Sequence, residues 1–206
     1  MKKSAILVID VQKDFTQSSG RLPVDLNQAE QMIANINAIV ASTDTEILLP
    51  IYIGNEFRKF DPLNIFRNFS AIRGTAGCGL DPRLKIVGDM YFSKEEGDAL
   101  SNPSLVSFLR ESKIEHLYLT GLQAEACVYR TFRGALKRGF SCSVIQDAIA
   151  SKTEARRQRM LRKFASEGAN IVSTAQFLER YDPQSDLQPL VDCKTTGHRE
   201  ESSTMA

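Results

Sequence analysis

The sequence predicts a three-layer α/β sandwich, in which a mostly parallel, Rossmann-like sheet of about six strands is flanked by helices. Short apolar runs of strand length alternate along the chain with segments of helical periodicity. Several of these runs are apolar throughout, which is typical of strands that are covered on both faces of a parallel sheet. The repeated strand–helix units therefore indicate right-handed crossovers and a doubly wound sheet.

The predicted elements follow one another in a regular order. The strands are expected at residues 5–9, 46–53, 85–90 with a possible extension, 116–121, 141–146 and 170–173. The helices are expected at residues 26–40, 103–111, 125–137, 151 to about 166, and 175–181. In the first helix the apolar residues recur at every third or fourth position, which predicts one buried face.

Helix ends carry signals of their own. Asp25 stands just before the first predicted helix and is suited to cap it. Ser151 and Glu154 have the spacing of a capping box. Gly139 and Gly168 each follow a helical segment, where glycine commonly ends a helix.

Two regions do not follow the strand–helix pattern. Residues 54–81 are long and rich in aromatic and basic side chains, so they are expected to form a lid, a binding wall or an interface. Residues 182–206 are polar and are expected to be a tail. The chain is therefore divided into a single domain at 1–181 and a C-terminal tail at 182–206.

Composition and charge exclude several classes of protein. The 206 residues are 42% hydrophobic, which suits one domain with a substantial core. The net charge is only +1, so neither a nucleic acid nor a membrane surface is expected as a partner. No apolar run reaches the roughly 20 residues of a membrane helix, and the run at 5–9 is too short for a signal peptide. A cytoplasmic protein is expected.

Four cysteines, at positions 78, 127, 142 and 193, raise the question of a reactive thiol. They form no C-x-x-C pair, and the chain has only two histidines, so no zinc site is expected. Cys142 lies in a predicted core strand and Cys193 in the tail, while nothing near Cys78 would activate it. Cys127 remains, with two interpretations: a nucleophile or a buried structural cysteine.

Sites in parallel sheets form at the carboxyl ends of the strands, where three residues here carry chemistry. Asp10 closes the first strand, and it is either a general base, a cap or a solvated end. Lys94 follows the third strand, and by itself it is a typical surface lysine. Cys127 falls in the first turn of a helix, where free backbone N–H groups and the helix dipole favour a thiolate and an oxyanion.

Three segments resemble the isochorismatase-like cysteine hydrolases. ILVIDVQKDF resembles the opening motif of that family, GLQAEACVYRTFRGALKRGF its nucleophile segment, and QDAIAS the strand end that follows. The family's lysine begins a pattern K-x3-S-A-F-x2-T-x-L, and Lys94 stands eleven residues before Leu105, at the same spacing. The chain departs from that pattern at Asp98, Leu100 and Pro103. The resemblance spans about residues 4–180, nearly the whole predicted domain.

The resemblance implies a triad and a mechanism. Asp10 would accept the thiol proton of Cys127, and Lys94 would stabilise both charges. The thiolate would attack an amide-like carbonyl and form a thioester that water hydrolyses. The backbone N–H groups of Gln123 and Cys127 would form the oxyanion hole, beside a cis peptide bond between Leu122 and Gln123. Relatives are often dimers or tetramers, so a homo-oligomer is expected.

The presence of the cysteine favours C–N bond hydrolysis over isochorismate hydrolysis, which needs no nucleophile. The D-x-H metal pattern of nicotinamidases is absent after the second strand, so no metal and no cofactor are expected. The expected substrate is a small amide, carbamoyl or ureido compound. Candidate substrate-binding residues are Phe15, Arg58, Arg73, Tyr91 and Arg130, each of which also has a purely structural interpretation. Two alternatives remain: an isochorismatase proper, and an inactive family member that serves as a binding or scaffold protein.

Overall fold

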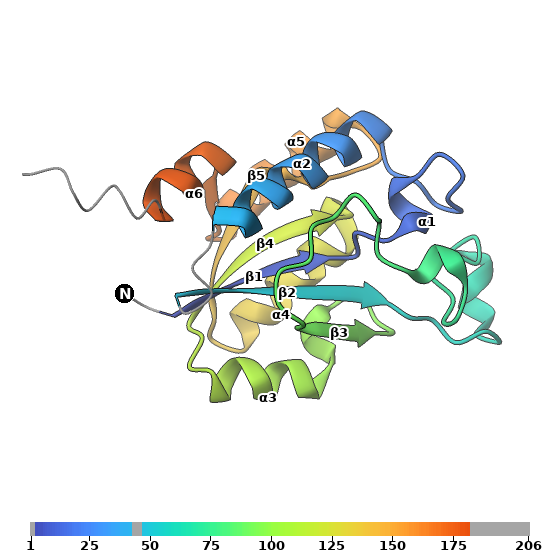
Figure 1. The fold of residues 1–206 in the computed structure, drawn as a ribbon, viewed down its shortest axis with the longest axis horizontal. Helices are drawn as coiled ribbons and strands as arrows, with labels where there is room; N and C mark the ends of the chain where they lie inside the picture. Colours follow the sequence, from blue (N-terminus) through green and yellow to red (C-terminus); the bar gives the residue numbers. More distant parts are fainter. Residues whose placement is uncertain (1–2, 43–46, 182–206) are drawn as a thin grey trace, which may run out of the picture.

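The structure is a computed structural model that describes residues 3–42 and 47–181. Its centre is a sheet of six parallel strands in the order β3-β2-β1-β4-β5-β6 (Figure 1). The strands are β1 Ser4–Ile9, β2 Leu48–Asn55, β3 Tyr91–Lys94, β4 His116–Leu122, β5 Ser141–Ala150 and β6 Asn170–Val172. This confirms the predicted α/β fold with a Rossmann-like sheet.

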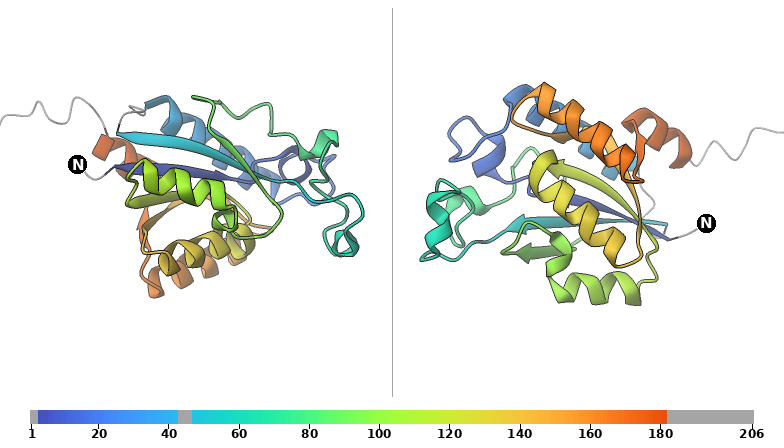
Figure 2. Two further views of the ribbon diagram at one scale, coloured as in Figure 1. Left: turned by 90° about the horizontal axis from the view of Figure 1, so that it is seen from below. Right: turned by 180° about the vertical axis from the view of Figure 1, so that it is seen from behind.

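Helices cover both faces of the sheet (Figure 2). One layer contains α1 Lys13–Thr16, α2 Leu26–Ser42 and α6 Thr174–Tyr181, and the other contains α3 Pro103–Glu111, α4 Tyr129–Lys137 and α5 Glu154–Ser166. Short 3-10 turns lie at Pro62–Ile65, Ala76–Cys78 and Ala99–Ser101, and one π-helical turn lies at Ala124–Val128. None of the helices in the described ranges is long and apolar enough to cross a membrane.

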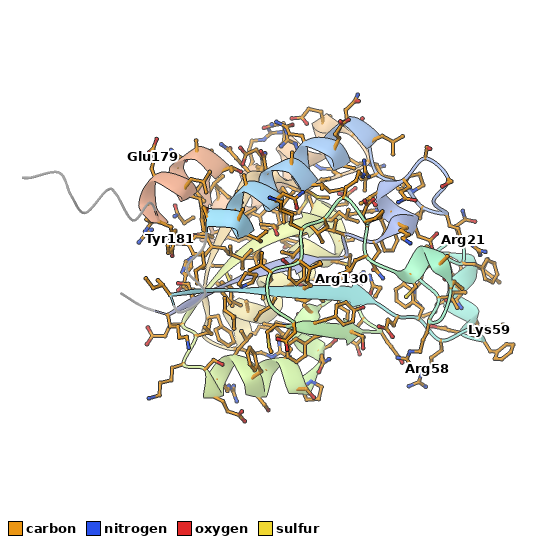
Figure 3. The ribbon with its side chains drawn as sticks, viewed as in Figure 1. Arg21, Arg58, Lys59, Arg130, Glu179 and Tyr181 are labelled. Atoms are coloured by element: carbon orange, nitrogen blue, oxygen red, sulfur yellow. The ribbon has the colours of Figure 1, made fainter. Side chains whose placement is uncertain are left out.

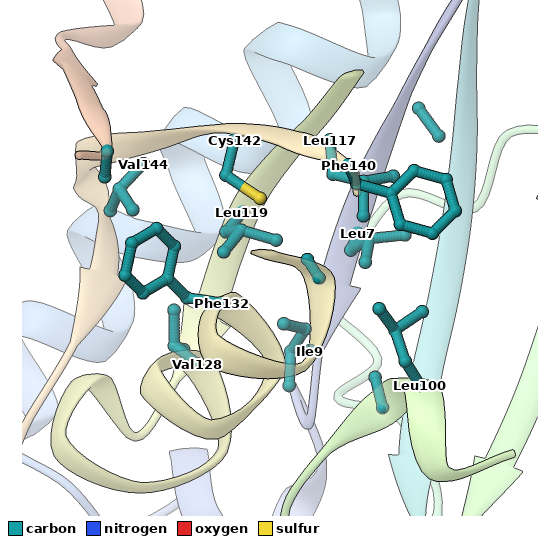
Figure 4. Close-up of a cluster of buried hydrophobic side chains, with 14 of the residues drawn as sticks. Leu7, Ile9, Leu100, Leu117, Leu119, Val128, Phe132, Phe140, Cys142 and Val144 are labelled. Atoms are coloured by element: carbon teal, nitrogen blue, oxygen red, sulfur yellow. The ribbon is translucent and has the colours of Figure 1, made fainter. Parts of the chain in front are cut away.

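The burial of β1 on both faces explains why residues 5–9 are all apolar. Ile6 and Val8 pack toward α2, whereas Leu7 and Ile9 point into the opposite core with α3, α4 and α5 (Figure 4). Every residue of the strand is buried. Alternate side chains of a strand lie on opposite faces, so a strand covered on both sides needs apolar residues at every position.

The position of the site follows from the strand order. The chain runs from β1 outward to β2 and β3, then returns to β4 and runs the other way, so β1 and β4 flank the switch point of the sheet. Gly121 of β4 is paired with Ile9 of β1. Gly121 has φ 100°, and a Cβ there would collide with the carbonyl oxygen of Ile9. Glycine therefore allows the ends of these two strands to approach closely.

The third strand differs from its prediction. Residues 85–90 do not form a strand, and β3 is the following segment, Tyr91–Lys94. The phenol of Tyr52 donates to the carbonyl of Lys85 at 2.9 Å and accepts from the N–H of Val87 at 3.0 Å. A side chain thus provides hydrogen bonds that a neighbouring strand would otherwise supply.

Two predictions of helix ends also need correction. The cap of α5 is Thr153, whose side chain accepts from the N–H of Arg156, and not Ser151. The Ser151 hydroxyl instead donates to the carboxylate of Glu125, in the turn that carries Cys127. The helix predicted at 125–137 is divided into the π-helical turn and α4. The predicted cap at Asp25 is confirmed, because its carboxylate accepts from the N–H of Gln28 at 3.0 Å.

The first two residues of the long segment 54–81 end β2, and the rest of the segment contains two of the 3-10 turns. Its large apolar side chains are exposed at Phe60, Leu63, Ile65, Phe66 and Phe69. Its predicted role as an oligomer contact stays a prediction. The predicted tail at 182–206 lies outside the described residues.

Candidate active site

Four strands deliver one polar side chain each to the same edge of the sheet. Asp10 follows β1, Asn55 ends β2, Lys94 ends β3, and Cys127 lies in the π-helical turn after β4. Asp10 adopts a left-handed conformation with φ 56°, while its N–H still donates to the carbonyl of Ile53 at 2.8 Å. Such backbone strain is uncommon for a residue other than glycine and is found preferentially at functional sites.

A buried ion pair lies at the centre of the site. Lys94 Nζ is 2.9 Å from Asp10 Oδ2, with side-chain exposures of 0% and 2%. The lysine also donates to Asn55 Oδ1 at 2.8 Å and to the carbonyl of Glu96 at 3.1 Å. These three acceptors use the three donors of the ammonium group.

The two oxygens of the Asp10 carboxylate have different surroundings. Oδ2 accepts hydrogen bonds from Lys94 Nζ and from Asn55 Nδ2, the latter at 2.8 Å. Oδ1 is buried and has no hydrogen-bond partner. Since a buried carboxylate oxygen rarely lacks a partner, this oxygen is open to accept a proton from a neighbouring group.

The Cys127 thiol lies near this carboxylate, since the charge of Asp10 raises its pKa, and it lines the cavity of the site. Burial and the negative charge of Asp10 together raise the pKa of Cys127 to about 11, while Lys94 opposes both. Burial alone would lower the pKa of Lys94, but the charges of Asp10 and Cys127 hold it above its ordinary value. At neutral pH the cysteine is therefore a thiol beside a lysine ammonium group.

A cavity of about 170 Å³ opens over these groups. This is smaller than the roughly 300–1,000 Å³ of pockets for drug-sized ligands, so it fits a small molecule. Its apolar wall consists of Phe15, Leu22, Phe57, Leu122 and Ala126. Polar and charged lining residues are Asp10, Asn55, Arg67, Ser70, Glu95, Gln123, Cys127 and Arg130.

The structure brings together some of the predicted substrate-binding residues but not others. Phe15 and Arg130 line the cavity, whereas Arg58, Arg73 and Tyr91 do not. Arg58 is 2.9 Å from Glu95, and its exposed side chain points away from the sheet (Figure 3). Arg73 is 3.1 Å from a carboxylate oxygen of Glu56, and the Tyr91 phenol donates to the same carboxylate at 3.0 Å.

The backbone between β4 and the π-helical turn has the conformation that was predicted for it. The Leu122–Gln123 peptide bond is cis, as the resemblance implies. Gln123 and Cys127 both line the cavity, so their N–H groups belong to segments that border it. Their role as an oxyanion hole stays a prediction.

Comparison with known proteins decides the family. A family model described as the isochorismatase domain matches residues 4–176. The chain belongs to the isochorismatase family. It is 29% identical over 170 residues to the ureidoacrylate amidohydrolase RutB of Enterobacter sp. (strain 638), covering 70% of this chain and 74% of that one.

Solved structures agree with this family assignment. An isochorismatase-like hydrolase from Alkaliphilus metalliredigens has a TM-score of 0.81 and 26% identity, over 87% of this chain and all of that one. N-carbamoylsarcosine amidase from Thermoplasma acidophilum shares the fold, with a TM-score of 0.72 and 22% identity, over 84% of this chain and 96% of that one. The protein is thus an isochorismatase-like hydrolase.

This isochorismatase-family chain has further site residues that were not predicted. Arg67 lines the cavity with its guanidinium 3.9 Å from the Phe57 ring centroid, and it is 2.9 Å from Asp61. Asn55 touches all three members of the predicted triad. Its place at the carboxyl end of a strand was the signal that could have identified it. Within 3–42 and 47–181, no group of three or more His, Cys, Asp or Glu side chains is arranged to hold a metal.

Proposed function

We propose that this protein hydrolyses a C–N bond of a small amide, carbamoyl or ureido compound, with Cys127 as nucleophile and an acyl-cysteine thioester as intermediate. The observation that carries the proposal is the free oxygen of Asp10. Oδ1 is buried without a partner and Oδ2 is held by two donors, while the Cys127 thiol lies close enough for the charge of Asp10 to raise its pKa. A base that is fixed on one oxygen and open on the other is suited to take the thiol proton.

The proposed reaction balances in two halves. The thiol proton moves to Asp10 Oδ1 as sulfur bonds to the substrate carbonyl carbon, and the carbonyl becomes an oxyanion near the N–H groups of Gln123 and Cys127. The oxyanion then collapses, the C–N bond breaks, and Asp10 returns the proton to the leaving nitrogen. In the second half, water gives a proton to Asp10 as its oxygen bonds to the thioester carbon. The C–S bond then breaks, the acid leaves, and Asp10 returns the proton to the sulfur, which restores the thiol.

Lys94 stays an ammonium group throughout this cycle. Its pKa is held above its ordinary value despite burial, because Asp10 and Cys127 supply negative charge. While the negative charge moves from Asp10 to the sulfur and back, one nearby positive charge stabilises both arrangements. Its proposed role is therefore electrostatic, and it transfers no proton.

Arg130 points to the substrate class. It lines the cavity, and as a fixed cation it can bind a carboxylate through two parallel hydrogen bonds. The relative named ureidoacrylate amidohydrolase acts, by its name, on a ureido compound that carries a carboxylate. We therefore propose a small ureido or amide acid as substrate, with its carboxylate at Arg130 and its carbonyl at Cys127.

The test is a substrate panel, in which ammonia release reports hydrolysis of the nitrogen compounds and pyruvate release reports hydrolysis of isochorismate. N-carbamoylglycine and 3-ureidopropanoate represent ureido acids, nicotinamide a neutral amide, and isochorismate the reaction of the family's namesake. We expect turnover of a ureido acid that Cys127→Ala abolishes, and a mass shift on Cys127 equal to the acyl group after acid quenching. Cys127→Ala with wild-type turnover, or activity on isochorismate alone, would overturn the proposal.

Two arms address the remaining alternatives. Turnover that disappears with a chelator and returns with added metal would contradict the metal-free reaction. An inactive scaffold protein would hydrolyse nothing in the panel, and its Cys127 would show no acylation by the activated ester p-nitrophenyl acetate.

A further inference from the structure

We propose that Asn55 is a fourth catalytic residue, whose side-chain amide holds Oδ2 of Asp10, so that Oδ1 is left to accept the proton, and donates to the Cys127 thiolate as it forms. This inference rests on the proposed function, because it assigns a role within the same cysteine chemistry. It starts from three contacts of one amide group: with Lys94, with Asp10 and with Cys127.

The orientation of the Asn55 amide is set by its neighbours. Lys94 has only donors, so the oxygen of the amide must face it, and Oδ1 accepts from Nζ at 2.8 Å. Nδ2 then faces Asp10 Oδ2 at 2.8 Å and Cys127 Sγ at 3.7 Å. An amide nitrogen has two hydrogens, so one is available for each of these acceptors.

The first consequence concerns Asp10. With Lys94 and Asn55 both donating to Oδ2, a proton on that oxygen would displace a donor, whereas a proton on Oδ1 displaces none. Asn55 thereby distinguishes the two oxygens of a carboxylate that is otherwise symmetric. Proton transfer is thereby directed to Oδ1, the oxygen that has no donor.

The second consequence concerns the sulfur. A thiol accepts hydrogen bonds weakly, but a thiolate accepts them strongly, so the 3.7 Å contact with Nδ2 gains strength as the proton leaves. Burial and Asp10 raise the pKa of Cys127, and the hydrogen bond from Asn55 acts with Lys94 in the opposite direction. An interaction that strengthens during the reaction lowers its barrier.

The backbone of Asn55 is held tightly enough for this role. The side chain of Gln12 accepts from the N–H of Asn55 at 2.9 Å and donates to its carbonyl at 2.8 Å. Asn55 is also the register partner of Lys94 between β2 and β3. Gln12 and Asn55 are both buried, so two hydrogen bonds and a strand pair fix the amide before substrate arrives.

The experiment measures thiolate formation directly, with iodoacetamide as the probe. The rate of Cys127 alkylation is followed by mass spectrometry from pH 6 to 11 in the wild type, Asn55→Ala and Asn55→Ser. Neither substitution can reach both Asp10 and the sulfur. The charged groups that act on Cys127, namely Asp10 and Lys94, are retained in every variant.

A matched control is another buried asparagine. The Nδ2 of Asn64 donates to the carbonyls of Arg58 and Lys59, and Asn64 does not line the cavity. Asn64→Ala therefore reports what the loss of a buried amide does to the fold alone. Thermal unfolding of all variants shows whether each is folded.

We expect both Asn55 variants to shift the alkylation profile to higher pH, with the rate at pH 8 falling about 10- to 100-fold. The rate for Asn64→Ala is expected to stay within about twofold of the wild type, as for a change away from the site. Either folded Asn55 variant reacting at the wild-type rate would overturn the proposal, and so would an equal loss in Asn64→Ala. Alkylation needs no turnover, so this result is distinct from a failure of the substrate panel.

Discussion

Lys94 Nζ lies 2.9 Å from Asp10 Oδ2, in a pair that is almost wholly removed from solvent. Removing one partner of a buried pair leaves a charge without compensation, which costs about 3–5 kcal/mol. Lys94→Met is therefore expected to lower the free energy of unfolding by about that amount, as measured by urea denaturation. The double variant Asp10→Asn/Lys94→Met should recover much of the stability while remaining inactive.

The control for that experiment is the surface pair of Arg58 and Glu95, 2.9 Å apart with Arg58 exposed. Exposed pairs contribute about 1 kcal/mol or less, so Arg58→Ala should change stability by no more than this. Equal losses in Lys94→Met and Arg58→Ala would contradict the view that burial makes the first pair different.

Asp10 has opposite effects on thiolate formation and on turnover. The charge of Asp10 is the second-largest cause, next to burial, that raises the pKa of Cys127, so Asp10→Asn should lower that pKa. In the wild type, with a pKa of about 11, alkylation of Cys127 by iodoacetamide should still be rising between pH 8 and 10. The Asp10→Asn profile should move to lower pH, so that alkylation at pH 8 becomes faster.

Hydrolysis by the same Asp10→Asn variant should fall by roughly 10²–10⁴-fold, because the amide cannot take and return the proton. Faster alkylation together with slower hydrolysis is the diagnostic result, and both rates are measured on one preparation. Slower alkylation of a folded Asp10→Asn protein would contradict the assigned direction of the pKa shift.

Arg130 is expected to set the preference for acids. Arg130→Met should reduce kcat/KM for a ureido acid by about 10- to 100-fold, the effect of a lost charge-assisted hydrogen bond. A neutral amide such as nicotinamide should lose less than about threefold. Arg73→Met is the matched control, because Arg73 is paired with Glu56 outside the cavity. Equal effects of both variants on the acid would show that Arg130 does not contact it.

Gly121 is expected to tolerate no side chain. It has φ 100°, and a Cβ would collide with the Ile9 carbonyl, so Gly121→Ala should destabilise the fold by about 3 kcal/mol or more. Gly139 has a similar φ of 83° but open space around it, so Gly139→Ala should cost only about 1 kcal/mol. Urea unfolding of the two variants separates close packing from backbone strain, and equal costs would contradict the steric argument.

Much of the fold was predictable from local pattern. The apolar runs and the helical periodicity predict which segments are strands and helices. A strand buried on two faces is apolar at successive positions, whereas a helix buried on one face is apolar at every third or fourth position. The exception is β3, where the Tyr52 phenol binds the backbone of the expected strand. No local pattern reports a hydrogen bond from a distant side chain. Ser151 was misassigned as a cap for the same reason, since its hydroxyl binds Glu125 across the fold.

The candidate site was also predictable from the sequence only in part. Asp10, Lys94 and Cys127 were identified through the motifs that resemble the isochorismatase-like family, because their positions at strand ends alone left each with a structural interpretation. The sequence could not show which arginine enters the cavity, because Arg58, Arg67 and Arg73 all belong to one long segment. Only Arg67 of these three lines the cavity, where it packs on the Phe57 ring and pairs with Asp61.

The sequence by itself therefore determined the α/β architecture, because periodicity is a local property, and its resemblance to the family indicated the three residues proposed to carry the chemistry. Only the tertiary structure decided that Asn55 joins them, that Asp10 keeps one oxygen free, and which arginines line the cavity. These features depend on contacts between segments tens of residues apart, whose geometry is set when the strands pair and the long segment folds over their ends.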